Sequence, residues 1–414
     1  MNPAIFQMLL SPTGQQALQA AEALAPRESD FLPHLTSLCR QYPKELASAA
    51  LEIAILRLEA RGKFPAASQM YFTRSALEQA SGQEVSRYRC QRFAGCELLL
   101  DLGCSVGGDT LSLAELAPTI GLDLDPLRLA MAGANLAQAN LKALNPAHET
   151  IFIQADLRNS LPVNAAGHTG AFFDPARRTA ERRIFSVQRY LPPLDLIENW
   201  LPVIPALGVK LSPGVDLAEL KCYAGEVEFI SLRGELKEAV LWLGSLKTVQ
   251  RRATVLLGAV SSPQPFTLTG APDGPSEISP AVRLSEPQAY LYEPDPSILR
   301  AGLVRTLGLQ LDAAQLDPDI AYLTSDRLVE SPFAKAYQVE DWLPFNLKRL
   351  RSLLRQRGVK RVVVKKRGSP IRPEALIHDL RLQPTNHATG VERIVFLTHL
   401  RGQPIVVICL PQSR

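Results

Sequence analysis

The chain has 414 residues, of which 46% are hydrophobic and 21% are charged, and these are ordinary values for globular domains. No apolar run approaches the ~18 residues that a membrane helix needs, and residues 1–26 lack the Lys or Arg that opens a secretory signal. We therefore expect a cytoplasmic protein of two or three domains. The six cysteines and six histidines are scattered without C-x-x-C or H-E-x-x-H patterns, so no protein-bound metal is expected.

Residues 1–90 predict a helical segment. The stretches "SPTGQQALQAAEAL" and "ELASAALEIAILRLEARG" are rich in Ala, Leu, Glu and Gln, and their apolar residues recur at helical spacing. The stretch "TRSALEQAS" predicts a further helix with Thr73 as its N-cap.

Residues 91–260 predict a Rossmann-like domain with a parallel sheet. Between Leu98 and Ser212, short apolar runs alternate with helical stretches, as expected for a sheet covered on both faces; these runs are "ELLLDL", "TIGLDL", "TIFIQA", "GAFFD" and "GVKLS". The following "EVEFISLRGELKEAVLWLG" predicts an antiparallel hairpin at the edge of the sheet, turning at Arg233-Gly234.

Residues 261–280 are dense in Pro, Ser and Gly and predict a linker or long surface loop. Residues 281–414 predict a smaller α/β domain, with helices around "PSILRAGLVRTLGL" and "NLKRLRSLLRQRG" and strands at "RVVVKK", "RIVFLTH" and "PIVVICL". The net charge of +4 is mild, but residues 342–373 hold eleven basic residues and no acidic one. Such a local excess favours a polyanionic partner.

The stretch "LLLDLGCSVGGDT" (98–110) predicts a strand that runs into a glycine-rich turn and then a helix. Glycines let the backbone approach a ligand, and the helix start offers free N–H groups. The dinucleotide fingerprint G-x-G-x-x-G fails, because Ser105 stands at its second glycine position. The S-adenosylmethionine pattern D-x-G-x-G-x-G fits at Asp101, Gly103 and Gly107, with Ser105 in place of the middle glycine. A strand-turn-helix without a ligand is the alternative.

Two more acids follow at the ends of predicted strands. Asp123, about 20 residues beyond the loop, is placed to accept hydrogen bonds from ribose hydroxyls, and Asp156 could accept the exocyclic amino group of an adenine. Either acid alone is more often a cap or a turn residue. Because ligands bind at the carboxyl ends of parallel strands, acids at three successive strand ends predict a cofactor site.

The fourth strand leads into "FFDPARR" (172–178), for which two hypotheses compete. In the first hypothesis, Asp174 and Pro175 lie at the edge of an active site, where Asp174 orients an N–H nucleophile and takes its proton. Alternatively, Asp174 caps a turn and pairs with Arg177 or Arg178. In the first hypothesis these arginines bind substrate, by stacking on a base or pairing with phosphate. Lys210, which ends the next strand, either faces the substrate or closes the sheet edge.

With these motifs, residues 95–245 resemble the class I S-adenosylmethionine-dependent methyltransferases. The chain is similar, more specifically, to a bacterial branch with an N-terminal helical segment and a C-terminal "THUMP-like" domain. That similarity rests on "YFTRSALEQAS" (71–81), "DPARR" (174–178), "VKLSPG" (209–214), "GELKEAVLW" (234–242), "LYEPDPSILRAGL" (291–303) and "KKRG" (365–368).

The resemblance implies roles for particular residues. Amino-methylating members of the superfamily carry Asp/Asn-Pro-Pro-Tyr/Phe where this chain has Asp174-Pro175, so the Asp and the following carbonyl would hold the target amino group. Here Ala176 and Arg177 replace the second Pro and the aromatic ring. THUMP domains present tRNA to modifying enzymes, and a basic segment without interleaved aromatics predicts phosphate contacts, which we assign to Lys365, Lys366 and Arg367.

The sequence thus predicts a methyltransferase that uses S-adenosylmethionine to modify a base nitrogen in structured RNA, either tRNA or rRNA. Two alternatives remain open: methylation of a protein or small molecule, and a catalytically silent RNA-binding protein that keeps the cofactor fold for structure. The sequence does not name the RNA, the base, the atom or the oligomeric state.

Overall fold

The computed structural model describes residues 1–140, 148–165, 167–176, 186–259, 263–271, 283–382 and 391–411. They form two compact units. The first comprises Met1–Val227, Lys237–Thr248 and Gly258–Pro263, and the second comprises Glu228–Leu236, Val249–Leu257 and Gln264–Arg414. In the described part of the chain, no helix is long and apolar enough to cross a membrane.

The N-terminal helices share a core with residues that follow the first and second strands of the first unit. Their bounds are α1 (Pro3–Leu10), α2 (Pro12–Ala23), α3 (Phe31–Leu38), α4 (Lys44–Ala60), α5 (Arg74–Gln79) and α6 (Gln83–Cys90). In α4, Leu51 and Ile53 are fully buried and belong to one hydrophobic cluster with Val106 and Met131, which lie beyond the first strand. Thr73 caps α5 as predicted, accepting a 3.2 Å hydrogen bond from the Ala76 N–H. The helical segment therefore folds onto the sheet domain.

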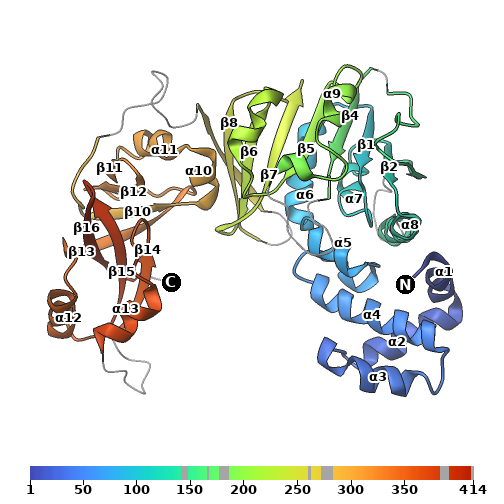
Figure 1. The fold of residues 1–414 in the computed structure, drawn as a ribbon, viewed down its shortest axis with the longest axis horizontal. Helices are drawn as coiled ribbons and strands as arrows, with labels where there is room; N and C mark the ends of the chain where they lie inside the picture. The colour runs from blue at the N-terminus through green and yellow to red at the C-terminus, as the bar shows by residue number, and fades with distance from the viewer. Residues whose placement is uncertain are drawn as a thin grey trace. The chain divides into compact units, whose positions relative to one another are not determined.

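Five parallel strands form the predicted Rossmann-like sheet (Figure 1). They are β1 (Leu98–Leu102), β2 (Thr119–Asp123), β3 (Thr150–Gln154), β4 (Thr169–Phe173) and β5 (Ala206–Leu211), accompanied by α7 (Thr110–Leu113), α8 (Pro126–Asn140) and α9 (Leu196–Trp200). Because β1 lies between β2 and β4, the strand order reverses at β1. The carboxyl ends of β1 and β4 thus meet at a topological switch point, where ligands bind in such sheets.

The predicted hairpin is present, but its predicted position at the sheet edge is wrong. Strands β6 (Glu226–Leu232) and β7 (Glu235–Gly244) are joined by Arg233 and Gly234, both with positive φ, as a two-residue turn requires. The sheet continues through β8 (Arg251–Leu257) and β9 (Gln264–Gly270), in the order β3-β2-β1-β4-β5-β7-β6-β8-β9.

Strand β9 also corrects the prediction of a linker at residues 261–280, because it occupies part of that range. It is the last strand of the sheet and most of its residues are exposed. An exposed edge strand tolerates Pro and polar residues, so its composition resembles that of a loop.

A second sheet of seven strands, in the order β11-β12-β10-β13-β16-β15-β14, forms the body of the second unit. Its strands are β10 (Tyr290–Pro294), β11 (Ala314–Asp317), β12 (Ile320–Ser325), β13 (Ala334–Pro344), β14 (Val359–Lys366), β15 (Val391–Leu400) and β16 (Gln403–Cys409), and its helices are α10 (Pro296–Ala301), α11 (Val304–Gln310), α12 (Leu347–Gln356) and α13 (Pro373–Leu380). Leu350 and Leu354 of α12 share a core with Val395 and Val406, as the leucine spacing of that helix indicates.

Candidate active site

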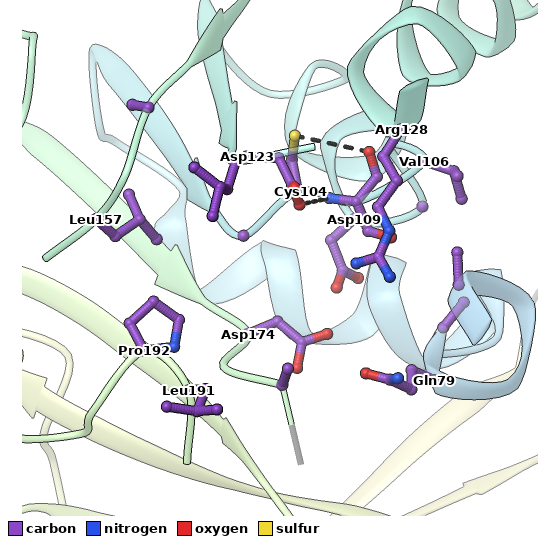
Figure 2. Close-up of a pocket in the computed structure, with 18 of the residues that line it drawn as sticks. Gln79, Cys104, Val106, Asp109, Asp123, Arg128, Leu157, Asp174, Leu191 and Pro192 are labelled. Carbon is purple, nitrogen blue, oxygen red and sulfur yellow. Dashed lines mark hydrogen bonds between the residues drawn. The ribbon is translucent and has the colours of Figure 1, made fainter. Parts of the chain in front are cut away.

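A cavity of about 340 Å³ lies in the first unit, at the carboxyl ends of β1 to β4 (Figure 2). This volume is typical of a small-molecule site. Its wall combines the loop after β1, the ends of β2, β3 and β4, and part of α5. The lining residues include the predicted Gly103, Ser105, Asp123, Asp156 and Asp174.

The loop after β1 turns sharply where the sequence pattern predicts. Gly103 and Gly107 have φ of +88° and +83°, and Ser105 adopts a left-handed φ of +52°. A Cβ atom on Gly103 would lie 2.9 Å from the Asp174 carbonyl oxygen. Gly103 thus allows the β1 loop to pack directly against the end of β4.

Asp123 ties the end of β2 to this loop. The side chain is nearly buried, and its carboxylate accepts hydrogen bonds from the backbone N–H groups of Ser105 and Asp125, both at 2.9 Å. It also lines the cavity, which is the position that binding to a ribose would require.

Asp101, in contrast, lies behind the loop and does not line the cavity. Thr110 donates a 2.5 Å hydrogen bond to its Oδ2, and its Oδ1 has no hydrogen-bond partner in the described structure. Burial, reinforced by repulsion from Asp109, raises the pKa of Asp101 to about 8. The hydrogen bond from Thr110 joins β1 to the start of α7. That Asp101 contacts the cofactor stays a prediction.

Asp156 follows β3 and is held by its own neighbour. The Arg158 backbone N–H donates to Asp156 Oδ1 at 3.0 Å, and the Arg158 guanidinium pairs with the same carboxylate. Hydrogen bonds from Arg158 lower the pKa of Asp156 to about 2. A carboxylate held ionised at the cavity wall is suited to accept an N–H donor.

Asp174 directly follows β4 and is held from behind by a buried lysine. Lys210 Nζ donates to Asp174 Oδ2 at 2.7 Å and to the Gln79 carbonyl at 3.1 Å. The Lys210 side chain is only 2% exposed and does not line the cavity, whereas Asp174 does. Lys210 therefore joins β4, β5 and the end of α5, an arrangement that neither hypothesis from the sequence described.

A second buried cation, Arg89 of α6, supports the other side of the site. Its fully buried guanidinium pairs with both Asp109 and Glu238, and it lies over the Phe172 ring at 4.0 Å. Burial alone would raise the pKa of Asp109, but Arg89 and then Lys210 outweigh it and lower that pKa below its ordinary value. Asp109, which lines the cavity, thus stays ionised.

Sequence reasoning missed both the Arg89 pairs and the contribution of α5 to the cavity wall. Ala76, Gln79, Ala80 and Ser81 line the cavity, and Lys63 Nζ donates to the Ala80 carbonyl at 3.0 Å. The sequence signal for this contribution was "YFTRSALEQAS" (71–81), a stretch of mixed polar and apolar residues that ends just before α6. Its position in the wall shows that the N-terminal segment forms part of the site.

Comparisons with known proteins place the chain in a family. An uncharacterized S-adenosylmethionine-dependent methyltransferase of Mycobacterium tuberculosis, found in strains CDC 1551 and H37Rv, is 34% identical over 347 residues. The match covers 80% of this chain and 88% of the relative. The chain belongs to the S-adenosylmethionine-dependent methyltransferases. It is therefore an enzyme whose cofactor is S-adenosylmethionine, as its sequence predicts.

Two family models match parts of the methyltransferase. Residues 334–411 match a THUMP domain-like family, which confirms the predicted THUMP-like domain, and residues 2–60 match a domain of unknown function. The fold is similar to the crystal structure of a "putative methyltransferase" from Porphyromonas gingivalis W83, with a TM-score of 0.73 and 21% identity. That similarity covers 94% of this chain and all of the other, so the architecture is common to both.

The cavity of the methyltransferase fits the cofactor chemically. The glycine turn lets the backbone form part of the wall without bulky side chains, Asp123 would offer a carboxylate to the ribose, and Leu124 and Leu157 would provide apolar surface for the adenine. When bound, S-adenosylmethionine supplies the electrophilic methyl group.

The remaining predicted site residues are placed as follows. Arg177 and Arg178 lie outside the described residues. Pro175 does not line the cavity, but Ala176 does, and it exchanges backbone hydrogen bonds of 2.7 and 3.2 Å with Leu191. Gly107 packs against Ala132. Among the described residues, no group of three or more His, Cys, Asp or Glu could hold a metal ion.

The three predicted phosphate contacts lie in the second unit and differ in their surroundings. Lys365 pairs with Glu293 and lies 5.3 Å from the centre of the Tyr337 ring. The Arg367 guanidinium lies 5.0 Å from the centre of the Tyr322 ring. Lys366 is exposed.

Proposed function

We propose that this methyltransferase transfers a methyl group from S-adenosylmethionine to a base nitrogen in structured RNA, either tRNA or rRNA. The observation that carries the reaction is the position of Asp174. It lines the cofactor cavity at the end of β4, and Lys210 fixes one of its oxygens. The THUMP domain-like match supports RNA as the substrate.

In this mechanism the protein mainly positions the two reactants. Asp174 Oδ2 is engaged by Lys210, so the Oδ1 atom is the one that accepts an N–H of the target nitrogen. As the nitrogen gains the methyl group, Asp174 takes its proton. Aligning nucleophile, methyl carbon and sulfur can remove about 7–11 kcal/mol of barrier.

Lys210 has a positioning role in this proposal. Its buried ammonium neutralises Asp174 and holds the carboxylate at a fixed place beside the cavity. Because the same Nζ also bonds the Gln79 carbonyl, α5 helps to set that position. The sequence-based proposal that Lys210 contacts substrate is thereby replaced by one in which it acts through Asp174.

For the RNA contacts, we propose the basic residues of segment 342–373 that have no internal partner. Five of the eleven are engaged: Arg351 and Arg355 with backbone carbonyls, and Arg357, Arg361 and Lys365 with carboxylates. In the described part of the chain, five others are exposed and make no ion pair, and these are Lys348, Arg349, Lys360, Lys366 and Arg372. Exposed unpaired cations are suited to bind phosphate.

The three-part division at residues 1–90, 91–260 and 281–414 and the cytoplasmic location remain part of this proposal. In such an arrangement the THUMP-like domain would hold RNA while the Rossmann-like domain modifies it.

The test is mass spectrometry of nucleosides from total RNA of strains with and without the gene. We expect one methylated nucleoside to disappear on deletion and to return with the wild-type gene. An unchanged nucleoside profile would contradict RNA as the substrate. Methylated protein or small molecules that depend on the gene would then support the first alternative, and cofactor binding without any turnover would support a silent RNA-binding protein.

A further inference from the structure

The charges in the cavity wall are almost all compensated within the protein. The described wall contains four carboxylates, from Asp109, Asp123, Asp156 and Asp174, and two guanidinium groups, from Arg128 and Arg158. Arg89 pairs with Asp109, Arg158 with Asp156 and Lys210 with Asp174, while Asp123 accepts two backbone N–H groups.

Arg128 is the least well compensated of these groups, because its ion pair with Asp125 is long, at 3.5 Å. It lies in the first turn of α8, and among the described residues its Nη2 donates only to the Ser75 hydroxyl, at 3.3 Å. Its Nε lies 3.5 Å from Asp125 Oδ2 but is buried without a hydrogen-bond partner in the described structure. A buried N–H group without a partner is costly, so its presence at a cavity wall points to a ligand that accepts from it.

The position of Arg128 matches one end of an extended ligand. Figure 2 shows its guanidinium on the side of the cavity where Asp109 and Gln79 lie, with Leu157 on the opposite side. Asp123 and Leu157 offer the contacts expected for ribose and adenine. The amino-acid end of the cofactor then extends toward Arg128.

We propose that Arg128 binds the carboxylate of S-adenosylmethionine. The carboxylate is the one anionic group of this cofactor, whose ammonium and sulfonium groups are cations that the acids of the wall can balance. A guanidinium group offers two parallel N–H donors that match a carboxylate, and it stays charged at any physiological pH. Asp109, on the same side, is placed to accept the ammonium group.

Calorimetry with two ligands tests this assignment without any turnover. S-adenosylhomocysteine carries the carboxylate, and its decarboxylated analogue S-adenosyl-3-thiopropylamine lacks only that group. We expect the wild type to prefer S-adenosylhomocysteine by roughly 10- to 100-fold, the range of a charged hydrogen-bonded pair. Arg128→Met should weaken S-adenosylhomocysteine binding by a similar factor and bind both ligands about equally.

Arg158→Met is the matched control, because it removes the other guanidinium of the wall. It should leave the preference between the two ligands at its wild-type value, since Arg158 is engaged by Asp156. Arg128→Lys, which keeps the charge, should retain part of the preference. An Arg128→Met protein that unfolds at the wild-type temperature yet keeps the full preference would overturn the proposal, and so would equal weakening of both ligands.

Discussion

The cavity and the basic segment of the second unit use the same residue types in opposite ways. In the cavity, Arg89 and Lys210 are 0% and 2% exposed and each contacts two segments of the chain. In the basic segment, Arg361 is 76% exposed and pairs with a single glutamate of the adjacent strand. Buried pairs fix geometry and are costly to break, whereas exposed pairs contribute little to stability. Burial thus separates the cations that fix the geometry of the site from those whose ion pairs contribute little to stability.

Breaking the most buried pair should have the largest effect. Arg89→Met leaves Asp109 and Glu238 without their cation in the interior, so we expect the free energy of unfolding to fall by about 3–5 kcal/mol. Arg361→Met, at an exposed pair, should cost less than ~1 kcal/mol. Denaturant titration measures the free energy of unfolding of both variants. Equal losses in the two variants would contradict the expected difference between the two regions.

Lys210→Met should impair methyl transfer while largely preserving cofactor affinity. Losing the Nζ contact frees the Asp174 carboxylate, and misplacing a positioned group can cost on the order of 10²-fold in rate. Because the two residues act as a pair, Asp174→Asn should cost less stability in the Lys210→Met background than in the wild type. The comparison of kcat, calorimetric affinity and unfolding in the four proteins checks this. Purely additive stability losses would argue against the pair.

Asp101 and Asp109 should make opposite contributions to the pH dependence of stability. The pKa of Asp101 is raised to about 8 in the folded state, so the native protein holds its proton longer than the unfolded chain does. Stability therefore falls as pH rises from about 4 toward 8, by up to ~1.4 kcal/mol per pH unit. Asp101→Asn should remove this fall.

The pKa of Asp109 is lowered, so its stabilising contribution is present above its unfolded pKa and is lost as pH falls toward the folded value. Asp109→Asn should therefore cost stability at neutral pH and less in acid. Urea titrations between pH 4 and 8 measure both variants. Parallel profiles for wild type and Asp101→Asn would show that Asp101 is ionised in the folded protein.

The smallest expected effect concerns the two adjacent lysines of β14. Lys366→Ala should reduce the salt dependence of RNA affinity by about 0.7–0.9 in the log-log slope, the value of one phosphate contact. Lys365→Ala should change that slope less, since Glu293 already engages its ammonium. Salt titrations of RNA binding distinguish the two. A larger change for Lys365 would mean that RNA displaces the internal pair.

The sequence predicts the parts of this molecule that depend on local patterns. The alternation of strands and helices places Asp123 and Asp174 at strand ends, and glycine spacing predicts the turn at Gly103. The cavity wall at Asp123 and Asp174 follows from these patterns, because parallel strands bring their carboxyl ends together.

The sequence does not predict features that depend on distant pairing. Arg89 and Glu238 are 149 residues apart, and Lys210 meets Gln79 across 131 residues. A lysine that ends a strand can face solvent, substrate or the interior, and only its partners decide which. The same holds for the basic segment, whose eleven cations look equivalent in sequence although five are engaged internally.

The most direct test of the account uses purified protein and RNA from the deletion strain. With S-adenosylmethionine labelled in its methyl group, the wild type should transfer label to a nucleoside of that RNA. Asp174→Asn should bind S-adenosylhomocysteine with wild-type affinity and transfer no label, because the residue acts on the nucleophile rather than on the cofactor. Full transfer by Asp174→Asn would contradict the central claim and return Asp174 to the role of a structural turn residue.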